Sequence, residues 1–333
     1  MKSYGNKNPN LTFGILEIRD GEFDGFGAIA KVVLEALIIM DGKGLIPYID
    51  IKSFCYTEKN KVNGTFNAFE YFFKQPCDVV LNRHVPRSEI LQSANVEFIQ
   101  ESEVKGILYG YVEKHGHYSI YSNQKFLNDA ADVLKKYIRI NSFSENVYGE
   151  IRGILQGWED MIGIHVRRAN IKEGFSLHSV AVEPYEHLEL LKKIRGSRKA
   201  FLATDDEEVL SVFGEEYKKG NVRWYHDVLR TPEQYSSKNI SVYCCEDKRR
   251  NHKYRLGYEI LKEILTLSYC GSLIAGFSNV NLIATIIKMS RGENYKEYLI
   301  IDKGSFGSGE GIGVEFHRDK VKAINREIFS QEE

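Results

Sequence analysis

A histidine and two arginines stand together at the end of an apolar segment. The segment from Met161 to Val166 is predicted to form a strand, with His165 near its end and Arg167 and Arg168 directly after it. Two guanidinium groups at this position could bind a diphosphate through paired hydrogen bonds. The alternative is a strand edge with two solvated arginines, but the carboxyl end of a strand favours a binding site.

A pair of aspartates follows the next predicted strand. Asp205 and Asp206 stand in a turn between an apolar strand over Ala200 to Ala203 and a helix that we expect to begin at Glu207. The alternative to a functional role is structural, because residues 204–207 fit a capping box and acidic residues stabilise a helix N-terminus. Taken alone, the pattern favours the structural role.

A third segment joins a predicted strand over 272–275 to the helix that follows. It reads Gly276, Phe277, Ser278, Asn279. Backbone N–H groups and hydroxyls at a helix N-terminus form an anion site, although an N-cap by Ser278 explains the pattern equally well. Glu263 lies one helix earlier, on a helix whose other face is apolar.

The first strand-to-helix turn of the chain carries two glycines. Gly25, Phe26 and Gly27 would let a backbone approach phosphate groups closely. Glycines in tight turns are commoner than phosphate loops, and the segment matches neither GxGxxG nor a P-loop. This segment is therefore a weaker candidate for nucleotide binding than the other three.

Several other chemistries have no support in the sequence. There is no HExxH, no Cys/His cluster of metal-site spacing, no GxSxG, no Walker A motif and no DxD, and the adjacent pair Asp205 and Asp206 does not substitute for DxD. A metal-free transfer needs cationic side chains and helix dipoles to stabilise a leaving diphosphate. His165, Arg167 and Arg168 meet that need, so we expect neither a metal nor a cofactor.

The elements that position these residues form two alternating series of strands and helices. In the first half, a strand over 12–18, a helix over 27–40 and a strand over 45–49 make one strand-helix-strand unit, whereas the tyrosine-rich residues 107–121 are strands or a loop. In the second half, predicted strands alternate with predicted helices. The strands cover 161–166, 200–203, 272–275 and 298–301, and the helices cover 187–194, 207–217, 254–269 and 279–289. Two further segments, 222–225 and 240–244, are candidate strands.

Strands that alternate with helices predict parallel sheets covered on both faces, which bind ligands at the carboxyl ends of their strands. A chain of 333 residues exceeds the usual limit of one hydrophobic core. The pattern changes near residue 157. We therefore predict an N-terminal α/β domain over 1–157 and a C-terminal Rossmann-like domain over 158–333.

The composition of the chain indicates which classes of partner and which cellular compartment to expect. A net charge of −1 argues against nucleic-acid binding, which needs a basic surface. The five cysteines form no CxxC pair, which is typical of reduced thiols. The first ten residues lack the apolar region of a signal peptide, and the most apolar stretch, 28–40, is too short to span a membrane. We expect a cytoplasmic protein without a transmembrane segment, and the sequence leaves peripheral membrane contact open.

Read in order, these motifs resemble the α1,6-fucosyltransferase superfamily, which includes the nodulation chitooligosaccharide fucosyltransferases and the animal core fucosyltransferases. Three patches carry the resemblance, namely GIHVRRAN at 163–170, FLATDDEEVL at 201–210 and the segment 259–283 with its GFSN. In the first half, GFG at 25–27 and NAFEYFF at 67–73 resemble the nodulation type.

The resemblance implies a GT-B-like fold, in which two Rossmann-like domains face a cleft, and an inverting, metal-independent transfer from GDP-fucose. It implies that Arg167 binds the β-phosphate of the donor and that Arg168 supports this contact. It also implies that His165 lies beside the nucleotide. It gives the pair Asp205 and Asp206 a required role.

The same resemblance implies that the Glu263 carboxylate accepts hydrogen bonds from the N1 and N2 groups of guanine. The core enzymes have aspartate at this position. Ser278 matches a donor near the phosphate, and its neighbours Phe277 and Asn279 are expected beside the nucleotide.

The chain also departs from the core enzymes. Asn170 stands where they have aspartate, as in the nodulation type, and the loop over 169–177 is about one residue shorter. That loop contains Glu173, one position away from the proposed acid/base carboxylate of the family. The chain lacks the stem and SH3-like additions of the animal enzymes, so the sequence gives no basis for predicting their N-glycan acceptor.

The leading hypothesis is therefore a GDP-fucose-dependent transferase acting on a glycan or a lipid-linked oligosaccharide. Two alternatives stay open at this point: a related glycosyltransferase with another donor or linkage, and a catalytically silent nucleotide-sugar binder. A carboxylate at Glu263 favours a GDP donor over UDP, and Arg167 with the aspartate pair favours an active enzyme.

Overall fold

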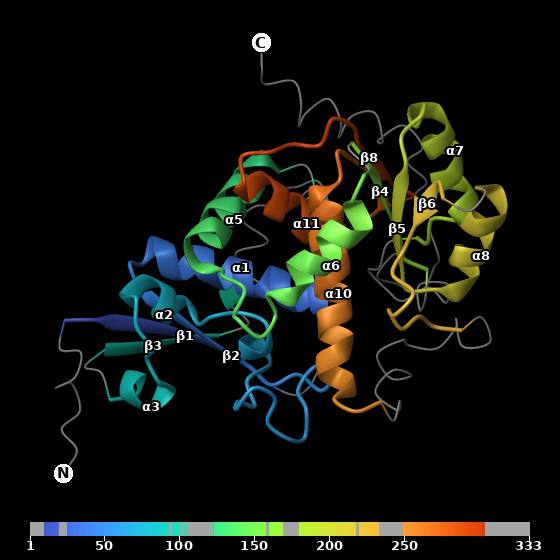
Figure 1. Ribbon diagram of the computed structural model, residues 1–333. Coiled ribbons are helices and arrows are strands. Elements are labelled where there is room, and N and C mark those ends of the chain that lie inside the picture. Colours follow the sequence, from blue (N-terminus) through green and yellow to red (C-terminus); the bar gives the residue numbers. More distant parts are fainter. Residues whose placement is uncertain are drawn as a thin grey trace, which may run out of the picture. The chain divides into compact units, whose positions relative to one another are not determined.

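The computed structural model describes most of the chain (Figure 1). The described residues are 10–19, 25–92, 95–100, 103–104, 121, 123–157, 160–168, 180–217, 220–232 and 249–303. Two predicted site residues, Asn170 and Glu173, lie outside these ranges, as do the segments 107–120 and 240–244.

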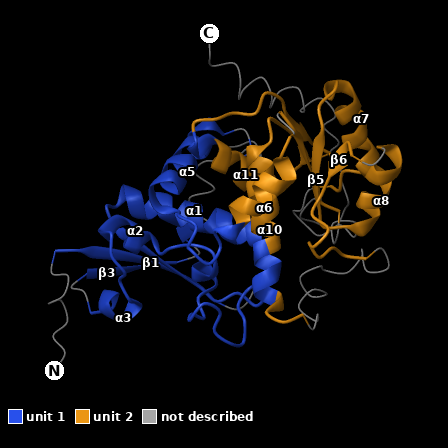
Figure 2. Ribbon diagram, in the orientation of Figure 1, with its two compact units in different colours: residues 1–146, 253–258, 289–291 blue, residues 147–252, 259–288, 292–333 orange. Residues whose placement is uncertain are grey.

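The chain forms two compact units (Figure 2). The first contains residues 1–146, 253–258 and 289–291, and the second contains 147–252, 259–288 and 292–333. The chain passes from the first unit to the second between Asn146 and Val147.

The first unit contains a three-stranded parallel sheet. Its elements are β1 (Thr12–Ile18), α1 (Phe26–Gly42), β2 (Ile46–Ile51), a 3-10 turn η1 (Ala68–Tyr71), α2 (Pro76–Leu81), α3 (Arg87–Ile90), β3 (Asn95–Ile99) and α5 (Gln124–Tyr137). The strand order is β2-β1-β3, and β1 pairs in parallel with both neighbours. The predicted strand-helix-strand unit is confirmed. After α1, Gly44 has a φ of 67°, a conformation that glycine adopts without strain.

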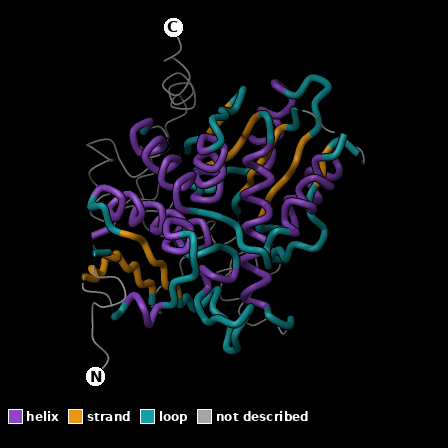
Figure 3. Tube along the Cα trace, turned by 60° about the vertical axis from the view of Figure 1, so that its left-hand side comes forward, coloured by secondary structure: helices purple, strands orange, loops and turns teal. Residues whose placement is uncertain are grey.

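The second unit contains a five-stranded parallel sheet with helices on both faces. It contains all or most of the residues of α6 (Asn146–Leu155), β4 (Ile162–Val166), α7 (Pro184–Ile194), β5 (Ala200–Thr204), α8 (Glu207–Glu216), β6 (Val222–Arg223), α10 (His252–Tyr269), β7 (Ser272–Gly276), α11 (Asn279–Ser290) and β8 (Tyr298–Ile301). Figure 1 shows α7 and α8 on one face of this sheet and α10 and α11 on the other, and Figure 3 shows its strands running side by side. The predicted α/β class with parallel sheets is confirmed.

The order of the strands in the second sheet reverses at β4. The order is β6-β5-β4-β7-β8, so the chain builds outward from β4 to β6 and then crosses to the other side of β4 to form β7 and β8. This is the doubly wound arrangement of Rossmann-like sheets. Its ligand crevice lies beyond the carboxyl ends of the two strands at the reversal, here β4 and β7.

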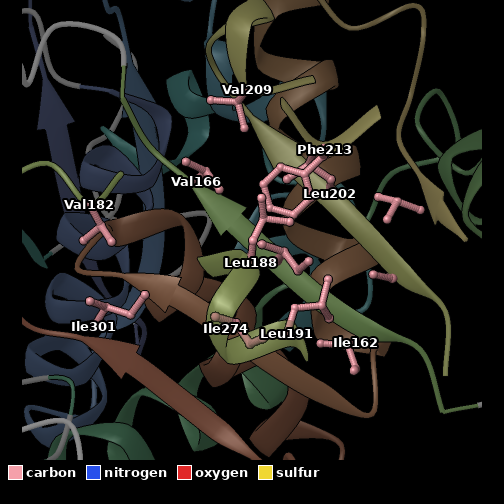
Figure 4. Close-up of a cluster of buried hydrophobic side chains, with 13 residues drawn as sticks. Ile162, Val166, Val182, Leu188, Leu191, Leu202, Val209, Phe213, Ile274 and Ile301 are labelled. Carbon is pink, nitrogen blue, oxygen red and sulfur yellow. The ribbon is translucent and has the colours of Figure 1, made fainter. Parts of the chain in front are cut away.

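The core of the second unit packs α7 and α8 against the sheet (Figure 4). Leu188 and Leu191 of α7 and Phe213 of α8 join strand residues such as Ile164 and Leu202 in one buried cluster. Every residue of β4 and β5 is buried, as expected of central parallel strands covered on both faces. Burial of each such side chain stabilises the fold by about 1.5–3 kcal/mol.

The described cysteines and helices bear on two further expectations. Cys55, Cys77 and Cys270 are buried and form no disulfide. Of the helices in the described ranges, none combines the length and the hydrophobicity that a bilayer crossing requires.

On the other face of the sheet, α10 packs closely on β4 at a glycine. A Cβ atom added to Gly163 would lie 3.0 Å from Leu267 Cδ2 and 3.2 Å from the Cβ and Sγ of Cys270. This position therefore needs glycine for the close approach of the helix, not for its backbone angles.

We predict that Gly163→Ala lowers the free energy of unfolding by about 1–3 kcal/mol, because the added methyl group overpacks the contact between β4 and α10. Gly149→Ala is the matched control. A Cβ at Gly149 meets no atom within 4 Å, so alanine in this helix should raise stability by about 0.5–1 kcal/mol. Denaturant unfolding followed by circular dichroism measures both, and an unchanged stability of Gly163→Ala would contradict the packing argument.

Candidate functional site

Three of the four sequence motifs lie at one edge of the second sheet. His165 of β4 is paired in register with Ala203 of β5 and with Ala275 of β7. The residues that follow these three strands therefore leave the sheet at the same carboxyl edge, beside the reversal of strand order. The edge brings together Arg167 and Arg168, Asp205 and Asp206, and Phe277, Ser278 and Asn279.

Arg168 is held by a group of carboxylates. Its side chain is 11% exposed, and its Nη1 lies 2.6 Å from Glu208 Oε2 and 3.9 Å from Asp206 Oδ2. Its Nε lies 3.5 Å from Glu183 Oε2. These three carboxylates neutralise the guanidinium, so Arg168 holds the edge together and has little charge left for a ligand.

The other two residues of the motif have different electrostatic states. Among the described residues, Arg167 has no ion-pair partner, and its side chain is half-buried. His165 is buried, and its Nδ1 has no hydrogen-bond partner within the described ranges. Burial, together with the charges of Arg167 and His187, lowers the pKa of His165 to about 3. His165 is therefore neutral, which differs from the expectation that it supplies positive charge. That charge comes from Arg167.

The aspartate pair has two separate roles in the structure. Asp206 is fully buried and caps α8, because its Oδ1 accepts a hydrogen bond of 3.0 Å from the N–H of Glu208. The cap is therefore Asp206, not Thr204 as the predicted capping box has it. Asp205 Oδ1 accepts a bond of 2.9 Å from the N–H of Arg168, and so ties β5 to the end of β4.

The turn after β7 leads directly into a helix of twelve residues, α11. Ser278 is buried, and its Oγ accepts a bond of 3.3 Å from the N–H of Val280. The N-cap interpretation of this serine is thus supported. The positive end of the helix dipole still points to the carboxyl edge of the sheet, where it favours an anion.

Glu263 on α10 is buried and paired with Arg230. Glu263 Oε1 accepts a bond of 3.1 Å from Arg230 Nη2, and both side chains are shielded from solvent. Burial raises the pKa of Glu263 to about 8, Arg230 opposes the rise, and the charge of Asp205 adds to it. Arg230 is followed by Thr231, whose N–H donates to the carbonyl of Asp205 at 2.9 Å, so the partner of Glu263 is tied to the carboxyl edge.

The fourth motif belongs to the first unit. Gly25 precedes α1, and its carbonyl accepts bonds from the N–H groups of Ala28 and Ile29. The N–H of Phe26 is already bonded to the hydroxyl of Tyr56 at 2.9 Å. The ring of Phe26 packs edge-to-face on Tyr56, and Gly27 is buried. These contacts give the turn a packing role within its own unit.

Sequence reasoning missed three residues that shape the edge. Glu183 and Glu208 neutralise Arg168, and Arg230 pairs with Glu263. The position of Glu208 could have been noticed in the sequence, because acidic residues in the first turn of a helix interact favourably with the helix dipole. Arg230 comes from an irregular loop with no local pattern. Among the described residues, no three His, Cys, Asp or Glu side chains gather as metal ligands.

No protein-family model matches the sequence, and no curated protein sequence matches it. Solved structures do match. A structure of NodZ α-1,6-fucosyltransferase soaked with GDP-fucose is 16% identical, with a TM-score of 0.49, over 84% of this chain and 93% of that chain. A structure of fucosyltransferase NodZ from Bradyrhizobium is 16% identical, with a TM-score of 0.46, over 83% of this chain and 92% of that chain. A structure of Arabidopsis thaliana FUT1 with GDP is 8% identical, with a TM-score of 0.42, over 91% of this chain and 73% of that chain.

The chain resembles fucosyltransferase structures. The structural match extends over most of the chain, at low sequence identity. The similarity concerns the fold.

We predict different consequences for the two neighbouring arginines. Arg168→Leu should lower the free energy of unfolding by about 3 kcal/mol, because it leaves the buried Asp206 carboxylate without its cation. Arg167→Leu should change it by less than about 1 kcal/mol, since no described carboxylate depends on Arg167. Denaturant unfolding of the two variants side by side is the measurement, and equal losses would contradict this division.

Proposed function

We propose that the chain is an inverting, metal-independent glycosyltransferase that moves fucose from GDP-fucose to an oligosaccharide or lipid-linked glycan. One observation carries the proposal. A guanidinium without a described ion-pair partner, Arg167, and the N-terminus of α11 stand at the carboxyl edge of a doubly wound sheet, on the two strands where the order reverses. This arrangement suits the diphosphate of a nucleotide donor.

The chemistry of the transfer assigns the main task to Arg167. The acceptor hydroxyl oxygen attacks the anomeric carbon, the bond from that carbon to the phosphate oxygen breaks, and GDP leaves with the electron pair. Negative charge grows on the β-phosphate as the bond breaks, and a fixed guanidinium strengthens its interaction as that charge grows. The acceptor proton passes to a base, for which Glu173 stays the sequence prediction.

The proposed preference for a guanine nucleotide depends on Glu263. A buried carboxylate can accept hydrogen bonds from the N1 and N2 groups of guanine, which present two donors side by side. Uracil offers no such pair of donors. Arg230, bonded to one oxygen of Glu263 at 3.1 Å, holds the carboxylate in place.

A thermal-shift panel with GDP, UDP, CMP and dTDP tests the donor. A nucleotide at a hundred times its dissociation constant stabilises the protein by about 2.7 kcal/mol. GDP should give the largest shift. Release of labelled fucose or its transfer from GDP-fucose, measured in EDTA, then separates an active enzyme from a silent binder. No shift with any nucleotide would overturn the proposal.

We predict that Arg167→Lys lowers kcat by about 10²- to 10³-fold, because lysine keeps the charge but loses the planar pair of donors. The structure sharpens the comparison with Arg168. Because Arg168 is neutralised by carboxylates, the effect of Arg168→Lys should fall mainly on stability. Steady-state kinetics on both folded variants measure the difference, and near-normal turnover in Arg167→Lys would favour the silent binder.

We predict that Glu263→Gln weakens GDP binding about tenfold, because the amide presents a donor to the guanine N–H groups. In the unmodified protein, GDP affinity should rise as the pH increases from 6 towards 8, since deprotonation of a carboxyl with a pKa of about 8 creates the acceptor. The rise should vanish in Glu263→Gln. Isothermal titration calorimetry measures both effects.

Glu259→Gln is the matched control for this prediction. Glu259 is buried one turn earlier on α10 and also binds an arginine, with Arg249 Nη1 at 2.7 Å. Its substitution weakens a comparable structural pair one turn away from the carboxylate that is expected to bind guanine. If both variants lose GDP affinity equally, the loss reflects the stability of α10 and not recognition of the base.

A further inference from the structure

The second unit contains a cleft of about 1040 Å³ beside the edge strand β6. It lies between α6, the end of α8 and the segment over 220–226. None of the described residues of the predicted nucleotide site lines it, and β6 is separated from the reversal of strand order by β5. The cleft therefore belongs to a different part of the unit from the proposed donor site.

Aromatic rings form much of the wall of this cleft. Tyr217, Trp224, Tyr225 and His226 all line it. Trp224 rests on the backbone of α8, since a Cβ at Gly214 would lie 3.9 Å from its ring. The indole also packs against the buried hydrophobic cluster of the unit, and the centre of the His226 ring lies 5.6 Å from its own. These contacts fix the indole, so the cleft offers a preformed aromatic surface.

A carboxylate in the same wall is held by a buried lysine. Lys262 has no exposed surface, and its Nζ lies 2.8 Å from Glu150 Oε2 and 2.8 Å from Asp227 Oδ2. The ammonium also sits over the Tyr225 ring, 4.3 Å from its centre. Glu150 lines the cleft and Asp227 does not. A fixed carboxylate beside aromatic rings is a strong acceptor for a ligand hydroxyl.

The described cationic side chains around the cleft are bound within the protein. Arg223 donates to the carbonyls of Ile154 and Gln156, so its guanidinium ties β6 to the end of α6. Lys262 is neutralised by Glu150 and Asp227. Among the described residues around the cleft, Lys262 is thus paired with carboxylates and Arg223 is bound to backbone carbonyls, so this part of the wall favours a neutral ligand over an anion.

Glycines keep parts of the wall open to a ligand. Gly153 and Gly220 line the cleft, and a Cβ at either position would meet no atom within 4 Å. Only two aliphatic side chains, Ile154 and Val222, are among the described lining residues. That is too little aliphatic surface for the apolar face of a partner helix, which needs several such anchors.

We infer that this cleft binds a neutral oligosaccharide. Sugar rings present apolar C–H faces, which pack on aromatic rings, and hydroxyl edges, which donate to a carboxylate such as Glu150. A volume of about 1040 Å³ accommodates several sugar residues. The inference is independent of the proposed transfer reaction, because no residue of the donor site takes part.

Tryptophan fluorescence gives a local test. The chain has two tryptophans, Trp158 and Trp224, so Trp158→Phe leaves Trp224 as the only indole. Cellotetraose, maltotetraose and β1,4-mannotetraose are titrated into this variant up to about 20 mM, which reaches affinities weaker than 1 mM. At least one neutral tetrasaccharide should change the emission saturably, and tetragalacturonate, which is anionic, should bind more weakly.

Calorimetry on cleft variants then assigns the site. Trp224→Ala should weaken binding of the active tetrasaccharide about tenfold or more, and Glu150→Gln about threefold or more. Two matched controls should bind normally. Asp227→Asn removes the other partner of Lys262 outside the cleft, and Tyr185→Ala removes an aromatic ring that is 57% exposed on α7.

Each outcome decides the inference. Absence of saturable binding by all three neutral tetrasaccharides overturns it, as does binding that Trp224→Ala and Glu150→Gln leave unchanged. If circular dichroism shows that Trp224→Ala does not fold, Trp224→Phe takes its place, with a smaller ring and an expected loss of about threefold or more. GDP affinity of the same variants should stay normal, so failure of the donor proposal does not affect this result.

Discussion

The complete burial of β4 is the constraint on which the second unit depends. Each of its five residues is buried, and it pairs in parallel with β5 on one side and β7 on the other. Its contact with α10 leaves no room for a side chain at Gly163. Because β4 has no freedom to shift, the residues after it leave the sheet at a fixed point, beside the turns after β5 and β7. The candidate site follows from this.

The site separates two arginines that are adjacent in sequence. Arg168 is neutralised by three carboxylates and ties the end of β4 to α7 and α8, whereas Arg167 has no ion-pair partner among the described residues. His165 is neutral because burial opposes its protonation. Two neighbouring arginines thus differ in their described partners, and this difference is what the proposed binding of a donor diphosphate by Arg167 depends on.

Helix α10 carries buried charge on more than one side. Glu263 pairs with Arg230 near the carboxyl edge of the sheet, and Lys262 pairs with Glu150 and Asp227 beside the aromatic cleft. Buried ion pairs add little net stability, since desolvation costs about as much as the attraction returns, but removal of one partner is costly. These pairs therefore fix the positions of carboxylates in two separate places, which is what recognition of a base or a hydroxyl requires.

The sequence by itself determined the first strand-helix-strand unit, most strands and helices of the second unit, and the edge at which chemistry is expected, whereas it gave no prediction for β3 or α5. Apolar periodicity is a local property, and it placed β1, β4, β7 and β8 to within one residue. The parallel sheet then placed the strand-end motifs at one edge. Tertiary structure decided the electrostatic state of residues there: the neutrality of His165 and the partner of Glu263, which stands 33 positions away in the chain. Burial and ion pairing depend on residues distant in sequence, so no local pattern contains them.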